Sequence, residues 1–194
     1  MRQTEKAHIF LKEILRYGDH AIDATAGNGH DTKFLAEQVG SLGHVYAFDL
    51  QKESINECTR IIKDVGFLER VTFFQNCHSE LAKKLSGKID LKIKAVTFNL
   101  GYLPGGDKNL TTQPHTTLLA LKQAYEIVDP DGKISVIAYR GHPGGRKEFE
   151  NVENHINKMN WKFKKSSNCN DCDSPVLFLI SKNQTVAAGS TSMS

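Results

Sequence analysis

The sequence predicts an α/β fold built on a seven-stranded, mostly parallel sheet with helices on both faces. Apolar runs typical of strands alternate with helical segments along almost the whole chain, and such strands form parallel sheets that helices cover on both sides. The last two strand-like runs, 161–167 and 175–181, have no helix between them, so we expect an antiparallel pair at the edge of the sheet. The 194 residues suit one domain, 1–182, followed by a polar tail, 183–194, that we expect to be disordered.

The single elements follow from periodicity and from residues that break it. The first helix is expected over 4–17, where apolar residues recur at helical spacing until Gly18-Asp19 ends the pattern. The later helices are expected at 31–39, 52–65, 79–85, 116–128 and 145–158, and the other strands at 20–25, 44–48, 71–75, 93–100 and 133–139. Asp129-Pro130-Asp131-Gly132 predicts a turn, because proline and glycine supply the dihedral angles that turns require.

The chain is mildly basic, with a formal net charge of +3. This balance is compatible with RNA binding without indicating it, because binding depends on how charges cluster. Four lysines gather late in the chain, as a solvated surface or as a patch that faces RNA: Lys158, Lys162, Lys164 and Lys165. No apolar run could span a bilayer and the first residues lack a signal-peptide core, so we expect a cytoplasmic protein without membrane contact.

The four cysteines are too few and too scattered for a secreted disulfide framework. Cys169 and Cys172 form a lone CxxC, whereas a structural zinc ion needs four ligands. Cys77 and His78 could complete a set of four, but a reduced loop explains the pair without a metal. We therefore expect no metal ion.

The segment 23–32 carries the most informative motif. A short apolar run ends in Asp23, a glycine-bearing turn follows, and a helix opens after it. This order lets backbone N–H groups approach a ligand closely, since glycine has no Cβ. The candidate cofactor-binding residues here are Asp23, Thr25, Gly27, Asn28, Gly29, Asp31 and Thr32.

The type of ligand follows from what this turn lacks. The third glycine of GxGxxG is missing, and so is the lysine of a P-loop. A pyrophosphate favours a helix N-terminus without negative charge, so Asp23 and Asp31 disfavour it. Both acids complement the sulfonium and ammonium groups of S-adenosyl-L-methionine, which we expect as the cofactor.

Other polar residues follow the strands that end at the same edge of the sheet. Asp49 ends the second strand, where a carboxylate can accept hydrogen bonds from the hydroxyls of an adenosine ribose; a helix N-cap is the alternative role. Gln51, Asn76 and His78 lie at the same edge and are further candidates for cofactor contacts; a structural role is the alternative for Asn76 and His78. His115 and His142 lie on loops of this edge and are candidate catalytic residues, although loop histidines are often merely solvated.

Three motifs in this order resemble those of a known group. The sequence Asp-Ala-Thr-Ala-Gly-Asn-Gly-His-Asp-Thr at 23–32 is similar to motif I of class I S-adenosylmethionine-dependent methyltransferases. Together with the segment 99–107 and the glycine-rich loop 141–145, it resembles a small bacterial family labelled "putative rRNA methylase", over residues 5–182. The resemblance implies a class I methyltransferase (Rossmann-like) fold and methylation of 5-aminomethyl-2-thiouridine at the wobble position (U34) of tRNA.

The segment after the fourth strand also resembles the Asn-Pro-Pro-Tyr motif of enzymes that methylate exocyclic amines. That resemblance implies that Asn99 aligns the acceptor amine, and also touches the cofactor, while Tyr102 packs against the base. Leu100 and Gly101 stand in the proline positions, which weakens adenine or cytosine as the substrate. A strand-end cap is the alternative role for Asn99.

The predicted function is N-methylation of the wobble aminomethyl group in the tRNA anticodon loop, which yields 5-methylaminomethyl-2-thiouridine. A methyltransferase for rRNA or for a small-molecule amine is one alternative. An NAD-dependent oxidoreductase is another, disfavoured by the incomplete GxGxxG, and an RNA-binding protein without activity is a third. The residues leave the oligomeric state open, a homodimer included.

Overall fold

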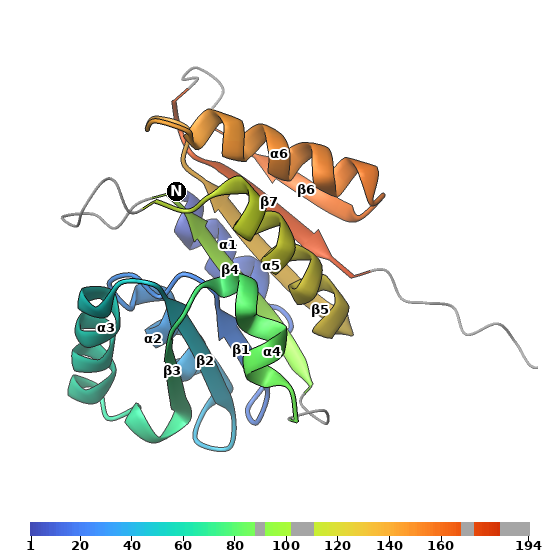
Figure 1. Cartoon of the computed structure of the whole chain (residues 1–194). Helices are drawn as coiled ribbons and strands as arrows, with labels where there is room; N and C mark the ends of the chain where they lie inside the picture. Colours follow the sequence, from blue (N-terminus) through green and yellow to red (C-terminus); the bar gives the residue numbers. More distant parts are fainter. Residues whose placement is uncertain (88–91, 102–110, 168–172, 183–194) are drawn as a thin grey trace, which may run out of the picture.

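The computed structural model describes residues 1–87, 92–101, 111–167 and 173–182, and within them one seven-stranded sheet has the order β3-β2-β1-β4-β5-β7-β6 (Figure 1). The strands are β1 (His20–Asp23), β2 (His44–Asp49), β3 (Val71–Gln75), β4 (Ile93–Leu100), β5 (Val128–Ala138), β6 (Lys162–Ser166) and β7 (Val176–Ser181). β7 is antiparallel to β5 and β6, and the other pairs are parallel. The predicted fold class and antiparallel pair are confirmed.

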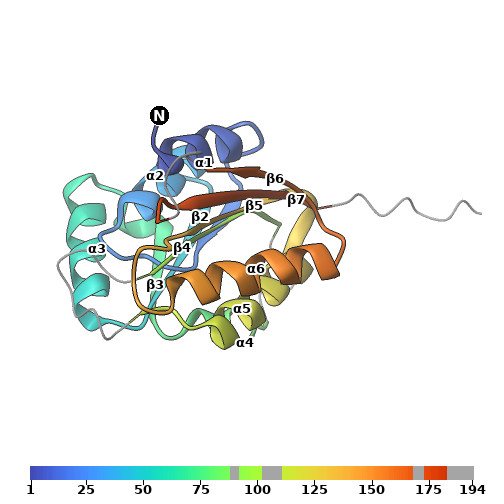
Figure 2. The ribbon, with the colours of Figure 1, turned by 90° about the horizontal axis from the view of Figure 1, so that it is seen from above.

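Helices cover both faces of this sheet (Figure 2). The helices are α1 (Gln3–Lys12), α2 (His30–Val39), α3 (Lys52–Asp64), α4 (Leu81–Leu85), α5 (Pro114–Ile127) and α6 (Gly145–Lys158), with short 3₁₀ turns at Leu68–Arg70 and His78–Glu80. α1, α2 and α3 lie on one face, and α4, α5 and α6 lie on the other. This is the three-layer arrangement that parallel strands require, because both of their faces are apolar.

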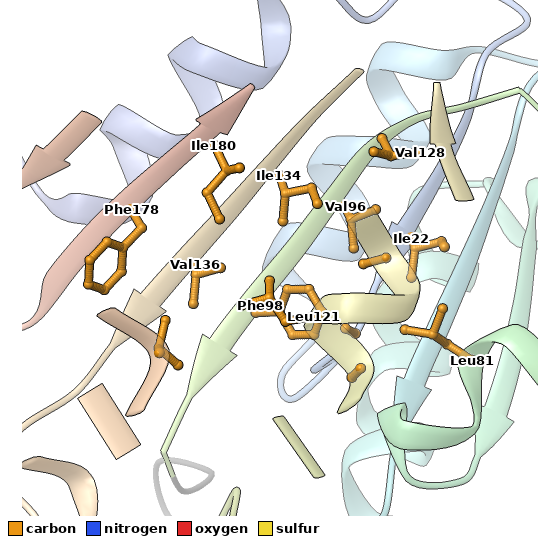
Figure 3. Close-up of a cluster of buried hydrophobic side chains, with 14 of the residues drawn as sticks. Ile22, Leu81, Val96, Phe98, Leu121, Val128, Ile134, Val136, Phe178 and Ile180 are labelled. Atoms are coloured by element: carbon orange, nitrogen blue, oxygen red, sulfur yellow. The ribbon is translucent and has the colours of Figure 1, made fainter. Parts of the chain in front are cut away.

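The larger hydrophobic core fills the space between the sheet and α4, α5 and α6 (Figure 3). Phe98, Val136 and Phe178 point from three neighbouring strands towards these helices, and Leu121 of α5 meets them; all four side chains are buried. A second cluster packs α2 and α3 on the opposite face. The two cores hold the central strands rigidly, so that the loops at their ends have fixed starting points.

The first helix is shorter than predicted. It ends at Lys12, whereas periodicity predicted a helix over 4–17. The backbone N–H of Arg16 donates to the Asp19 carboxylate at 2.6 Å, and Gly18 adopts a positive φ of 94°. These local interactions offer the chain an alternative to the helix, while Leu15 still reaches the core through the turn.

The prediction that a turn at 129–132 precedes the fifth strand was wrong, because residues 129–132 belong to β5. The register of β5 against β4 passes from Val128 opposite Ile93 to Lys133 opposite Ala95, so four residues bulge out opposite Lys94. The Lys94 ammonium pairs with Asp129 at 2.9 Å and also with Asp131. The turn residues therefore form a bulge within a continuous strand instead of ending it.

The parallel strands β1 to β5 end at one edge of the sheet. β1 lies between β2 and β4, so the strand order reverses there and the crevice for a ligand opens at its carboxyl end.

Candidate active site

A cavity of about 880 Å³ lies at the carboxyl ends of β1, β2, β3, β4 and β5, and this volume lies within the usual range of ligand sites. It collects residues from eight separate stretches of the chain. The described residues that line it are Thr4, Ala24, Thr25, Ala26, Gly27, Asn28, His30, Asp31, Asp49, Leu50, Gln51, Asn76, Cys77, His78, Asn99, Leu100, Gly101, Thr111, Thr112, Gln113, Thr116, Tyr139, Gly141, His142 and Asp173.

Hydrogen bonds to Asp23 stabilise the conformation of the β1–α2 loop, residues 24–29. The buried carboxylate accepts the backbone N–H of Thr25 at 3.1 Å and the hydroxyl of Thr32 at 2.6 Å. Gly27 and Gly29 have φ values of 49° and 77°, in the left-handed region that favours glycine. Asp23, Gly29 and Thr32 thus lie behind the cavity wall, and residues 24–28 form the wall itself.

Gly29 also has a packing role that the sequence motif did not reveal. A Cβ on Gly29 would lie 3.0 Å from the Cα and Sγ atoms of Cys58 in α3. Burial raises the pKa of the Cys58 thiol to about 12, so the thiol stays protonated and acts as a small apolar side chain. The start of α2 is therefore held close to α3, which fixes the loop in front of it.

Asp49 joins two loops of the site. One carboxylate oxygen accepts the N–H of Gly27 and the other accepts the N–H of Gln51, both at 2.9 Å. The N-cap residue of α3 is Gln51, so Asp49 does not have the alternative capping role. An ionised carboxylate has about four acceptor sites, and the side chain, which is only partly buried, keeps acceptor capacity for a ligand in the cavity.

The acids of this region give the site a negative character. Asp23 itself contributes less charge than an ordinary carboxylate near neutral pH, because burial and then the nearby Asp31 carboxylate raise its pKa from 3.8 to about 7. Asp31, Asp49 and Asp173 line the cavity, and no lysine or arginine does so among the described residues. Such a lining favours a cationic ligand over a pyrophosphate.

The side of the cavity next to β3 is lined by Gln51, Asn76 and His78, whose predicted contact with the cofactor stays a prediction. His78 is buried, and burial lowers the pKa of its imidazole to about 4. The ring is therefore neutral at physiological pH and contributes a shape and hydrogen-bonding atoms without a charge.

Asn99 is held in the cavity by two interactions of different kinds. Its backbone N–H donates to the hydroxyl of Thr25 at 2.7 Å, and its side-chain Nδ2 donates to Oδ2 of Asp31. Because a carboxylate only accepts, the amide nitrogen must face Asp31 and Oδ1 must point away from it. Within the described structure, this buried Oδ1 has no hydrogen-bond partner.

Sequence reasoning missed His8, which does not line the cavity but contacts Asp31, which does. Its Nε2 lies 2.5 Å from Oδ1 of Asp31, and its ring stacks on Phe34 with a centroid distance of 3.9 Å and an interplanar angle of 4°. Nothing in the local sequence marks His8, which stands 23 positions before Asp31. Only the packing of α1 over the sheet brings it there.

A buried glutamate that no sequence motif indicated supports the wall beyond β4. Glu148 of α6 accepts the hydroxyl protons of Thr112 and Thr117, each at 2.6 Å. The Thr112 hydroxyl in turn accepts the N–H of Gly101 at 2.9 Å. These bonds tie the end of β4 and the start of α5 to α6.

The predicted catalytic residues have different outcomes. His142 lines the cavity, and its Nδ1 donates to the carbonyl of Pro143 at 3.0 Å, so a neutral ring presents Nε2 as an acceptor. His115 is exposed on α5, and the structure does not bring it to the cavity. Tyr102 lies outside the described residues. Tyr139, which was not predicted, adds an aromatic ring to the lining at 41% exposure.

The described residues contain no group of three His, Cys, Asp or Glu side chains that could hold a metal ion. Cys169 and Cys172 lie outside the described residues, so the expectation about a metal stays a prediction. None of the described helices is long and apolar enough to cross a membrane.

Three of the lysines that gather late in the chain lie exposed on edge strand β6: Lys162, Lys164 and Lys165. Lys165 pairs there with Glu153 at 2.5 Å.

Residues 45–182 match the family model described as "Putative rRNA methylase". The chain belongs to this family. It is 42% identical over 160 residues to an Arabidopsis thaliana protein named tRNA (mnm(5)s(2)U34)-methyltransferase, chloroplastic. That alignment covers 78% of this chain and 58% of the relative, so the chain spans little more than half the length of this curated protein.

Two solved structures resemble the chain over nearly their whole length. A Clostridium thermocellum protein with the same description as the family is 35% identical, with a TM-score of 0.87, covering 94% of this chain and 98% of that one. A Streptococcus mutans "putative methyltransferase" in complex with SAH is 31% identical, with a TM-score of 0.83 and the same coverage. The fold is that of class I methyltransferases, as the motifs predicted.

Proposed function

We propose that this protein is an S-adenosyl-L-methionine-dependent N-methyltransferase that acts on tRNA. Its substrate in this proposal is the aminomethyl group of wobble 5-aminomethyl-2-thiouridine. The observation that carries the proposal is the orientation of Asn99, because the Asp31 carboxylate turns the amide oxygen away from itself and leaves it as an acceptor for an amine N–H.

The residues of the cavity fit the cofactor. Gly27 and Asn28 offer a backbone that a ligand can approach, Asp49 offers acceptors for ribose hydroxyls, and Asp31 adds negative charge for a cationic group. Gln51, Asn76 and His78 line the side where an adenine would lie. When bound, S-adenosylmethionine supplies an electrophilic methyl group.

The chain's own residues would align and deprotonate the acceptor. An alkylamine is mostly protonated at neutral pH, so a proton must leave before the nitrogen lone pair can react. Oδ1 of Asn99 would accept one N–H and orient the nitrogen, and Nε2 of His142 would take the proton that leaves. Alignment of this kind contributes much of the catalysis in direct displacement reactions.

The choice of tRNA rests on the Arabidopsis relative, whose name specifies mnm(5)s(2)U34. A wobble base lies in a single-stranded loop, where recognition relies on stacking and backbone contacts, and Tyr139 offers an aromatic surface at the cavity. Ribosomal RNA is the second candidate, because the family description names it.

The cofactor class is tested by calorimetry with S-adenosylmethionine and with NAD on the same preparation. Binding of S-adenosylmethionine without binding of NAD supports the proposal. The reverse result would replace it with the oxidoreductase reading.

The substrate is tested with tRNA from cells that lack this protein. After incubation with S-adenosylmethionine, wobble nucleosides should gain one methyl group by mass spectrometry, while ribosomal RNA from the same cells should gain none. Methylation of the ribosomal RNA alone would reject the tRNA assignment.

A further inference from the structure

A third residue, His8, joins the pair that Asn99 forms with Asp31. Asp31 meets Asn99 with one carboxylate oxygen and His8 with the other. Because the carboxylate only accepts, Nε2 of His8 carries a proton and donates it at 2.5 Å. The three side chains thus form a chain of hydrogen bonds that runs from α1 through the start of α2 to the end of β4.

We propose that His8 is a positioning residue for methyl transfer, which acts through Asp31 to fix the Asn99 amide with its oxygen towards the acceptor amine. This inference rests on the proposed function and deepens it. Without a donor on Oδ1, the Asp31 carboxylate can rotate and the Asn99 amide loses its single orientation. A displacement of about 1 Å in an aligning group can lower the rate about 100-fold.

The ring of His8 is itself held in place. Its nearly parallel stack on Phe34 fixes the plane in which Nε2 points. Contacts with the sheet also hold α1, the helix that carries His8. Lys133 of β5 donates to the Phe10 carbonyl at 3.1 Å and pairs with Glu13 at 2.5 Å. At its start, the Lys6 ammonium donates to Ser166 at 2.8 Å. α1 is therefore a rigid support.

The position of Asp31 explains why such support is needed. Asp31 is the second residue of α2 and is buried, with 7% exposure. A buried carboxylate is stable only when its oxygens receive hydrogen bonds. His8 and Asn99 each donate one of these hydrogen bonds. Loss of the bond from His8 therefore changes the geometry of the bond between Asp31 and Asn99.

Three substitutions at one position separate the role of His8 from mere packing. His8→Gln keeps a donor near the place of Nε2, His8→Asn has an amide that is too short to reach Asp31, and His8→Leu removes the polar group. We expect kcat to fall about 10- to 100-fold in His8→Leu and His8→Asn and to recover to within about threefold in His8→Gln. The dissociation constant for S-adenosylhomocysteine should change less than about threefold in all three.

Ile9→Ala is the matched control, because Ile9 is the next residue on α1 and is exposed. Its kcat and melting temperature should equal those of the wild type. If His8→Leu keeps wild-type kcat, or if His8→Gln is as slow as His8→Leu, the positioning role is wrong. An equal loss of cofactor affinity and kcat would also overturn it.

A readout without substrate separates this inference from the proposed function. The side-chain amide resonances of Asn99, assigned by their absence in Asn99→Ala, should shift and exchange faster with water in His8→Leu, and His8→Gln should restore them. Identical Asn99 resonances in the wild type and His8→Leu would overturn the inference. A wild-type protein that methylates no tRNA would instead reject the proposed function.

Discussion

The two walls of the cavity are built by different kinds of interaction. In the β1–α2 loop, the bonds of Asp23 reach Thr25 and Thr32, which are two and nine residues away in the chain, and Asp49 reaches Gly27 across 22 residues. On the acceptor side, which we define as Asn99, Gly101, Thr112, Tyr139 and His142, the bonds reach much further. Asn99 meets Asp31 across 68 residues, and Thr112 meets Glu148 across 36.

The difference in sequence separation indicates which substitutions affect one wall of the cavity and which affect distant elements as well. A local network can keep its shape when another part of the site is altered, so cofactor binding should survive changes on the acceptor side. Long-range bonds depend on how α1, α5 and α6 pack on the sheet. Two residues connect the walls through Asn99: Thr25 of the loop accepts its backbone N–H, and Asp31, at the start of α2, accepts its side-chain amide.

The largest effect is expected from Asn99→Ala. Removal of the amide leaves the acceptor amine without its aligning oxygen, and loss of one such preorganised group costs about 100- to 1,000-fold in kcat. Steady-state methyl transfer to undermodified tRNA measures it. A kcat within tenfold of the wild type would show that the acceptor side aligns the amine by other groups.

Asp49→Ala should act on the other wall. Its carboxylate joins Gly27 to Gln51 and keeps acceptors for the cofactor, and hydrogen bonds to a charged group contribute about 1.5–3 kcal/mol. We expect affinity for S-adenosylhomocysteine to fall about 10- to 100-fold by calorimetry. Unchanged affinity would remove Asp49 from the cofactor site.

Glu148→Gln should loosen the acceptor side alone. The amide nitrogen of glutamine cannot accept from a threonine hydroxyl, and an unsatisfied buried group costs about 1–3 kcal/mol. Denaturant unfolding should reveal that loss, while cofactor affinity stays unchanged. Glu150→Gln, at an exposed position of the same helix, serves as the control and should unfold like the wild type.

Asp23 gives a pH dependence. Because burial raises its pKa from 3.8 to about 7, the folded protein binds more protons than the unfolded chain between these values. The free energy of unfolding should therefore fall as pH rises from about 4 to 7 and level off above 7. Asp23→Asn should abolish that fall in the cofactor-free protein; an unchanged slope would assign it to other groups.

Features that depend on neighbouring residues could be predicted from the sequence, whereas contacts between residues far apart in the chain could not. The sheet, the loop at 23–32 and the Asp49 position follow from local periodicity and motifs, and the structure has them where they were expected. His8 and Glu148 carry no local signal, because their partners lie on distant elements. The misplaced turn at 129–132 has a related cause: its ion pairs with Lys94 of β4 keep it inside a strand.

The division of the cavity into a cofactor wall and an acceptor wall is tested by the affinity of Asn99→Ala for S-adenosylmethionine, measured by calorimetry beside the wild type and Asp49→Ala. We expect Asn99→Ala to bind within about threefold of the wild type and Asp49→Ala to bind at least about tenfold more weakly. Equal loss of affinity in both variants would contradict the division of the cavity into a cofactor wall and an acceptor wall.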